Sequence, residues 1–268
     1  MFSYLYTYET LAAQNDLNYD GPIIAYCPDW RRKKDSNGNE VLGYMAYFIN
    51  NFSKAFEKKC GARFYYMRFD EKFSDIKDKV DGCFISGGRD IDPELYGEAN
   101  TGSNIQDKEF SKARWDWCQD LFDSAPKDMP IFGICYGFEI LNCIFGGKLV
   151  QDIENPHAHY EMREMKVKPG SHLWKAIGEK TKMEGQCYHH QGIKEVPDEL
   201  SVTAVDDHDG IPHALEWKGD DRIIFTVLWH PESTKHYRGD LDEDNKKIIS
   251  YFVERCRDYK KSRLAALK

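Results

Sequence analysis

The chain has 268 residues, of which 41% are hydrophobic and 14% aromatic, and its 37 basic and 45 acidic side chains leave a net charge of −8. This composition is typical of a folded globular protein, and the acidic balance argues against a nucleic-acid partner, whose phosphates need a basic face. No apolar run approaches the roughly 18 residues of a membrane span, and the N-terminus has neither the basic nor the apolar region of a signal peptide, so we expect no membrane partner and a cytoplasmic location.

Short apolar runs alternate with helical patterns through the first half of the chain. The expected elements, in chain order, are a strand (22–27), a helix (43–61), two strands (62–69 and 80–88), a helix (108–124), a strand (131–135) and a helix (136–147). Such alternation predicts an α/β fold with a mostly parallel sheet and helices on both faces. The helix over 108–124 carries an aromatic stripe that we expect in the core, formed by Phe110, Trp115, Trp117 and Phe122.

The second half is denser in strand-like segments and ends in a helix. These segments are EMKVKP, GQCYHH, LSVTAVDD, HALEWKG and RIIFTVLWH, and the helix is expected from Asp242 to Lys260. Neither an internal repeat nor a low-complexity linker separates the halves, so we predict a single domain over residues 1–268.

One cysteine, Cys135, lies between two glycines, Gly133 and Gly137, where a predicted strand meets a predicted helix. A sharp strand-to-helix turn exposes a nucleophile at the sheet edge and crowds the residues two positions away, so small residues are needed there. The helix N-terminus also favours the thiolate, which is the reactive form. The alternative is a buried structural cysteine that happens to lie between glycines.

A candidate base ends the strand RIIFTVLWH. His230 is followed by Pro231, which takes the chain out of the strand, and by Glu232, whose carboxylate could hold the imidazole tautomer. A single histidine at a strand end is usually structural, but together with the glycine-flanked cysteine it suggests a nucleophile, a base and an orienting acid.

Three motifs carry a resemblance to a known family: GICYGFEILN (133–142), LWHPE (228–232) and SGGRDIDPELYG (86–97). They resemble the class I glutamine amidotransferase-like superfamily, and the closest group is the γ-glutamyl-γ-aminobutyrate hydrolase family of cysteine peptidases. The likeness covers most of the chain, and the matching segments occur in the order expected for the family. It implies a flavodoxin-like three-layer sandwich in which a cysteine follows a central strand.

The resemblance also implies roles for individual residues. Cys135 would attack a γ-carboxamide to form a γ-glutamyl thioester, His230 would act as general base and acid, and Glu232 would orient the imidazole. The backbone N–H groups of Gly88 and Tyr136 would form the oxyanion hole.

The resemblance also implies substrate-binding positions, at one of which this chain differs from many relatives. His189, Gln191 and Gly192 match a loop that contacts the glutamyl head group, partly through its backbone. Glu139 stands where many relatives have Gln, so an ionised carboxylate there would accept from the substrate α-ammonium and repel its α-carboxylate.

Two further departures from the closest subgroup leave the substrate in doubt more than the reaction. Tyr136 replaces an Arg that is common there, and the segment KARWDW (112–117) lacks the usual acidic pattern.

The spacing of the cysteines and histidines gives little support for a bound metal ion or cofactor. The 8 cysteines form no CxxC pair and lie in apolar segments, as free thiols usually do. His189 and His190 near Cys187 raise the question of zinc, but no second ligand pair follows at the usual spacing. We therefore expect no metal ion and no cofactor.

Three functions remain. The first is a hydrolase that cleaves a γ-glutamyl amide of a small molecule to glutamate and an amine, where Asp206, Asp207 and Asp209 could favour a cationic amine. The second is a glutaminase subunit that supplies ammonia to a synthase on a separate chain. The third is an inactive binding protein on the same scaffold. A homodimer is left open.

Overall fold

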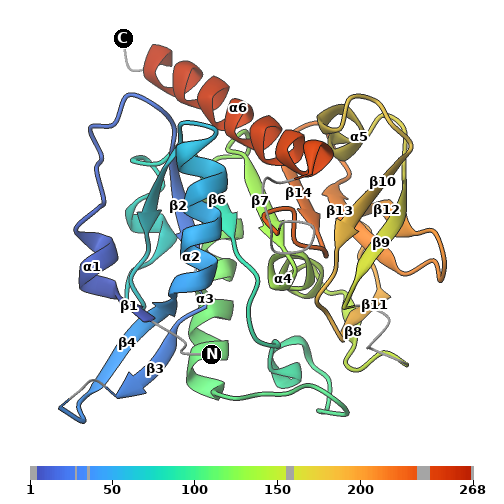
Figure 1. Cartoon of the computed structure of the whole chain (residues 1–268), viewed down its shortest axis with the longest axis horizontal. Coiled ribbons are helices and arrows are strands. Elements are labelled where there is room, and N and C mark those ends of the chain that lie inside the picture. Colours follow the sequence, from blue (N-terminus) through green and yellow to red (C-terminus); the bar gives the residue numbers. More distant parts are fainter. Residues whose placement is uncertain (1–4, 28, 35–36, 155–159, 234–241, 267–268) are drawn as a thin grey trace.

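A nine-stranded sheet crosses the computed structural model in the order β10-β9-β12-β13-β14-β7-β6-β2-β5 (Figure 1). The structure describes residues 5–27, 29–34, 37–154, 160–233 and 242–266. The parallel strands are β14 (Ile224–Val227), β7 (Ile131–Ile134), β6 (Gly82–Ile85), β2 (Ile23–Cys27) and β5 (Arg63–Tyr66). Every residue of β2, β6, β7 and β14 is buried, as in a parallel sheet covered on both faces.

Antiparallel strands extend this sheet beyond β14. They are β13 (Pro212–Trp217), β12 (Leu200–Asp206), β9 (Met162–Val167) and β10 (Lys182–Gln186). Buried and exposed residues alternate along β9, so this part of the sheet faces solvent on one side. The two halves of the chain join through the parallel pairing of β14 with β7.

Two small sheets flank the large one. The first contains β1 (Leu5–Thr7), β4 (Glu40–Met45) and β3 (Arg31–Lys34), and the second contains β11 (Gly192–Glu195) and β8 (Lys148–Val150). Short helical elements connect the strands: α1 (Tyr8–Ala12), η2 (Phe73–Asp75) and η3 (Pro93–Tyr96). Asp92 caps η3, where its side chain accepts from the N–H of Glu94 at 3.3 Å.

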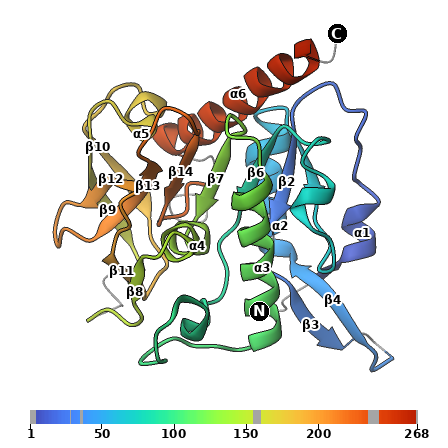
Figure 2. The same ribbon diagram turned by 180° about the vertical axis from the view of Figure 1, so that it is seen from behind.

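Helices cover both faces of the large sheet (Figures 1 and 2). On one face lie α2 (Ala46–Phe52), the π-helix η1 (Ser53–Lys58), α5 (His172–Ala176) and α6 (Glu243–Ala266). On the other lie α3 (Lys108–Ser124) and α4 (Tyr136–Ile144). Phe132 of β7 packs against Phe252 of α6 with ring centroids 5.4 Å apart, so aromatic side chains join the layers. The predicted three-layer α/β fold is confirmed.

Most predicted elements are present, but β10 includes only the first two residues of GQCYHH, β14 ends three residues before His230, and one helix needs correction. The helix predicted over 108–124 is α3, and its stripe lies in the core as expected, with Trp115 half-buried. The helix predicted over 43–61 begins only at Ala46, because the preceding residues form β4, and its second half is π-helical. No helix among the described residues combines the length and apolarity needed to cross a membrane.

The carboxyl ends of β6, β7 and β14 meet at one edge of the sheet. Gly87 and Gly88 follow β6, Cys135 follows β7, and His230 comes shortly after β14. Open parallel sheets bind their ligands at this edge, so the fold brings three separate sequence motifs to a single place.

Candidate functional site

Cys135 lies in a strained turn between β7 and α4. Its φ of 53° and ψ of −105° are unusual for a residue with a side chain, and such strain is often found at functional sites. The N–H of Cys135 donates to the carbonyl of Val227 at 2.8 Å, and its own carbonyl accepts from the first turn of α4. These bonds fix the cysteine at the N-terminus of the helix.

The backbone packs so closely around Cys135 that the glycines on either side leave no room for a side chain. A Cβ on Gly133 would lie 2.8 Å from the backbone of Gly137, and a Cβ on Gly137 would lie 2.5 Å from the carbonyl oxygen of Ile85. Real Cβ atoms do not approach backbone so closely, so the crowding argued from the sequence is present here.

His230 and Glu232 form a buried pair beside Cys135. His230 Nδ1–H donates to Glu232 Oε1 at 2.7 Å, and the same imidazole hydrogen-bonds with the Cys135 thiol. Burial lowers the pKa of His230, but the charge of Glu232 and the hydrogen bonds to Cys135 and Glu232 outweigh it and hold that pKa well above 6.5. The structure therefore brings together the three residues predicted as a triad.

The loop after β6 lies directly against this triad. A Cβ on Gly87 would lie 3.1 Å from His230 Cε1 and 3.4 Å from Cys135 Cβ, so any side chain there would occupy the reaction space. Tyr136 is the first residue of α4, where backbone N–H groups have no partner within the helix. Gly88 and Tyr136 thus lie on the two segments that border the thiol.

A buried arginine, which the sequence analysis did not single out, supports this loop from behind. Arg114 of α3 donates from Nη2 to the carbonyl of Ser86 at 2.5 Å, and its guanidinium lies 3.7 Å from the ring centroid of Tyr136. A Cβ on Gly88 would collide with Arg114 Nη1. The segment 112–117 and Tyr136, noted separately as departures from the subgroup, therefore meet at one contact.

Glu139 is buried on the first turn of α4. Burial, with a smaller effect from the Asp90 charge, raises its pKa from 4.5 to about 8, against opposing effects of His190, Arg114 and His230. The expectation of an ionised carboxylate at this position is thus corrected, because the side chain is largely neutral at pH 7. A neutral carboxyl presents both a donor and an acceptor, as the amide of the Gln common in relatives also does.

His190 was considered only for zinc, but its ring contacts the carboxylates of two acids, and the Glu139 carboxyl is near enough to affect its pKa. Its Nε2 is 3.0 Å from Asp90 Oδ2 and its Nδ1 is 3.2 Å from Asp152 Oδ1. The hydrogen bond to Asp90 is the main cause that raises the pKa of His190 to about 9. A cation therefore lies within electrostatic range of the largely neutral Glu139. No local sequence pattern could reveal it, because its partners come from two distant loops.

The other predicted substrate-binding residues follow β10. His189 Nδ1–H donates to the carbonyl of Gln191 at 2.9 Å. The Gln191 side chain donates to Ser103 Oγ at 2.9 Å and to a backbone carbonyl, and Gly192 begins β11. The His189 and Gln191 side chains are thus engaged within the protein. Contact with a substrate through the backbone of this loop stays a prediction.

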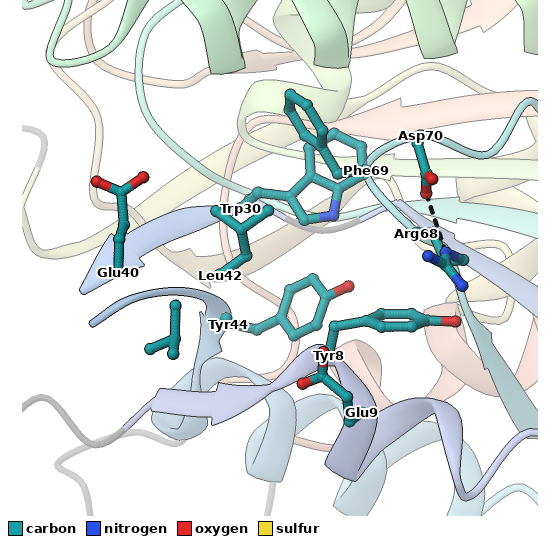
Figure 3. Close-up of a pocket in the computed structure, with 11 residues that line it drawn as sticks. Tyr8, Glu9, Trp30, Glu40, Leu42, Tyr44, Arg68, Phe69 and Asp70 are labelled. Carbon is teal, nitrogen blue, oxygen red and sulfur yellow. Dashed lines mark hydrogen bonds and ion pairs between the residues drawn. The ribbon is translucent and has the colours of Figure 1, made fainter. Parts of the chain in front are cut away.

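Two pockets lie near the edges of the site. One of about 250 Å³ is lined by the aromatic rings of Tyr8, Trp30, Tyr44 and Phe69 (Figure 3). The carbonyl of Trp30 accepts a hydrogen bond from Arg89, which directly follows Gly88. This hydrogen bond joins the wall of the pocket to the residue that follows the glycine pair.

The second pocket has a volume of about 520 Å³ and is lined in part by Gln151 and Asp152, so it adjoins His190. Cys135 lines neither pocket and is only 8% exposed. Cys135 is therefore largely shielded from solvent in this structure.

The acidic residues that suggested a cationic leaving group are already paired. Arg163 binds Asp206 at 2.5 Å and Asp209 at 2.7 Å, and Lys182 binds Asp207 at 2.7 Å. Because these cations neutralise the carboxylates, the group offers little attraction for an additional amine.

A family model described as peptidase C26 matches residues 22–232. The chain belongs to the peptidase C26 family. The match begins just before β2 and ends at Glu232, so it includes every site residue predicted from the sequence. The resemblance to the class I glutamine amidotransferase-like superfamily is confirmed.

Two proteins similar to this chain are named as an amidotransferase and as a synthase subunit. A Schizosaccharomyces pombe protein named "Putative glutamine amidotransferase" is 31% identical over 193 residues, covering 68% of this chain and 72% of the relative. One subunit of the glutamine-hydrolyzing GMP synthase of Methanopyrus kandleri is 23% identical over 182 residues, covering 68% and 79%.

A solved structure shares the fold of this peptidase C26 chain. It is the crystal structure of a protein described as a putative GMP synthase subunit from Thermoplasma acidophilum, with a TM-score of 0.66 and 15% identity. The alignment covers 92% of this chain and all of the other. Family and fold together identify a hydrolase-type scaffold.

Proposed function

We propose that this chain hydrolyses a γ-glutamyl amide through a thioester on Cys135, releasing glutamate and an amine. The observation that carries the proposal is the strained Cys135 at the N-terminus of α4, hydrogen-bonded to His230, which is bound to Glu232 at 2.7 Å. Membership of the peptidase C26 family supports the same chemistry.

The first half-reaction forms the thioester. His230 holds the proton of the Cys135 thiol, and the thiolate attacks the γ-carbonyl carbon. The oxyanion of the tetrahedral intermediate accepts from the backbone N–H groups of Gly88 and Tyr136. The C–N bond then breaks, and the amine leaves with the proton from His230.

The second half-reaction returns the enzyme to its starting state. His230 takes a proton from water, the hydroxide attacks the thioester carbonyl, and the C–S bond breaks. Glutamate leaves and releases its new carboxyl proton to solvent, and the Cys135 thiolate again lies beside the protonated His230. Glu232 keeps the imidazole oriented in both halves and compensates its charge, as the short Nδ1–Oε1 distance of 2.7 Å supports.

Recognition of the glutamyl head group falls to the charged groups beside the nucleophile. The protonated His190 is suited to the α-carboxylate, which would compete with Asp90 for the imidazolium. The neutral Glu139 donates or accepts one hydrogen bond in the place of a relative's glutamine. The backbone of His189, Gln191 and Gly192 supplies further contacts under this proposal.

A mass-spectrometric screen of γ-glutamyl amines, γ-glutamyl peptides and glutamine tests this function. We expect wild-type protein to release glutamate from at least one γ-glutamyl amine, and Cys135→Ala to release none. Turnover of glutamine alone, with every γ-glutamyl amine untouched, would contradict the proposal and favour a glutaminase.

A second candidate function rests on the relatives. The Methanopyrus kandleri protein is named as part of a synthase that hydrolyses glutamine. Under this alternative, the same Cys135 chemistry releases ammonia, and a synthase on a separate chain uses it. Glutaminase activity that rises when a partner synthase is added would support this candidate, whereas partner-independent hydrolysis of γ-glutamyl amines supports the first. An inactive binding protein would bind γ-glutamyl ligands without turning any of them over.

A further inference from the structure

A cysteine and two histidines form a buried cluster close to the triad but separate from it. Cys187, His189 and His213 each offer one ligand atom, and these atoms all lie within 4.8 Å of one another. All three residues are buried, with exposed fractions of 3% or less. Cys187 and His189 follow β10, whereas His213 comes from β13, so no spacing in the sequence could have shown the set.

The ligand types and their geometry suit a zinc ion. Zinc binds thiolate sulfur at about 2.3 Å and imidazole nitrogen at about 2.0–2.1 Å, so the ligand atoms of a tetrahedral site lie about 3.4–3.6 Å apart. Since the three atoms here lie within 4.8 Å, they need to converge by no more than about 1.4 Å. Rotation about side-chain bonds can supply a movement of this size.

One histidine is already oriented as in a metal site. His189 Nδ1–H donates to the carbonyl of Gln191 at 2.9 Å, and in that tautomer the lone pair lies on Nε2. Metal-bound histidines usually donate their other ring N–H in this way to a carbonyl or carboxylate. The ring of His213 meets that of His189 edge-on, with centroids 5.3 Å apart and an interplanar angle of 82°, which allows both nitrogens to approach one point.

We propose that Cys187, His189 and His213 bind a zinc ion through three protein ligands beside the catalytic residues. Binding releases the thiol proton of Cys187 to solvent, and the thiolate offsets one of the two charges of the ion. A water molecule completes the tetrahedron. Soft sulfur with imidazole selects zinc over magnesium or calcium, which prefer oxygen ligands.

The position of the cluster gives the ion a structural purpose. The N–H of His230 donates to the carbonyl of Gln186 at 2.9 Å, directly before Cys187, and the N–H of Leu228 donates to the carbonyl of His213 at 2.8 Å. The ion therefore links the two backbone segments that hold the strand end of His230. This proposal concerns the fold around the base and does not depend on which substrate is cleaved.

Cobalt binding tests the site without any activity measurement. Protein without a histidine tag is prepared in a Cys135→Ala background, which removes the catalytic thiol as a competing ligand. After metal removal, Co²⁺ is added and the absorption spectrum recorded. We expect a thiolate-to-cobalt charge-transfer band and tetrahedral d–d bands at about one Co²⁺ per chain, both lost on adding Zn²⁺.

Three further substitutions in that background assign the band. Cys187→Ser should abolish the charge-transfer band, whereas Cys83→Ser, at another fully buried cysteine, should retain it. His213→Gln should weaken binding at least tenfold while leaving the far-UV circular dichroism unchanged. Absence of the band in the Cys135→Ala protein itself, or its survival in Cys187→Ser, would overturn the proposal and leave the cluster as a packed polar group.

Discussion

Substitution of Glu139 by glutamine tests whether burial keeps this side chain neutral. Its pKa of about 8 in the folded protein compares with 4.5 for an ordinary glutamate. Between those values the unfolded chain has lost a proton that the folded protein keeps, so wild-type stability falls as the pH rises from about 4.5 to about 8. Above about pH 8, Glu139 is ionised in both the folded and the unfolded protein, so its effect on stability no longer changes with pH.

The size of this effect follows from the two pKa values. At about 1.36 kcal/mol per pH unit, the ionisable carboxyl costs the folded state roughly 2 kcal/mol at pH 6 and approaches roughly 5 kcal/mol above pH 8. Glutamine has nearly the same shape and does not titrate. We therefore expect the unfolding free energy of Glu139→Gln to exceed that of wild type by a margin that widens by roughly 2 to 3 kcal/mol between pH 6 and pH 9.

Urea denaturation of both proteins at pH 6, 7, 8 and 9 measures this margin. Glu195→Gln, at an exposed position on β11, is the matched control and should show a constant margin. Turnover provides a second readout, since wild-type activity should decline as Glu139 ionises above pH 8, while Glu139→Gln should lack that decline. A margin that stays flat across the pH range would show that Glu139 is already ionised at pH 6 and would refute the argument.

Five other substitutions address the proposed chemistry and its support. Cys135→Ala should abolish turnover and His230→Ala should reduce kcat by at least about 10⁴-fold, whereas Glu232→Ala should retain roughly ten to a hundred times more activity than His230→Ala; equal losses in kinetic assays would contradict the assigned roles. Arg114→Lys should lower kcat by about tenfold to a hundredfold with little change in KM, because lysine cannot reproduce the planar contacts behind the glycine loop; full activity would show that the guanidinium does not position that loop. Gly137→Ala should lower the unfolding free energy by roughly 2–4 kcal/mol in thermal denaturation, because its Cβ would meet backbone at 2.5 Å; an unchanged melting temperature would show that the turn can relax.

The nucleophile turn could be predicted because its requirements are local. Gly133 and Gly137 lie within two residues of Cys135, and each is crowded by backbone when a Cβ is added. The parallel strands were likewise visible as short apolar runs bounded by turn residues. His230, three residues after β14, followed from the same kind of local pattern.

The surroundings of the site could not be predicted from local patterns. Arg114 reaches Ser86 and Tyr136 from another helix, and His190 reaches Asp90 across a hundred residues of chain. Such contacts depend on how the loops close over the sheet edge, which hydrophobic periodicity does not encode. The neutral state of Glu139 also depends on its burial, so its charge could not be inferred from residue type.

The strand β4 was missed for a different physical reason. The strand Glu40–Met45 runs directly into the helix α2. Its last residues were predicted as the start of that helix, because Met45 lies at helical spacing from the apolar residues that follow it. Pairing with β1 and β3 stabilises the strand, and those partners have little apolar periodicity of their own.

Selective alkylation of one thiol tests the central claim most directly. Wild-type protein and His230→Ala are treated with a γ-glutamyl chloromethyl ketone, and the labelled peptides are identified by mass spectrometry over time. The account predicts rapid labelling at Cys135 alone among the 8 cysteines, much slower labelling in His230→Ala, and none in Cys135→Ala. Equal rates at Cys135 with and without the imidazole, or labelling that falls mainly on another cysteine, would contradict it.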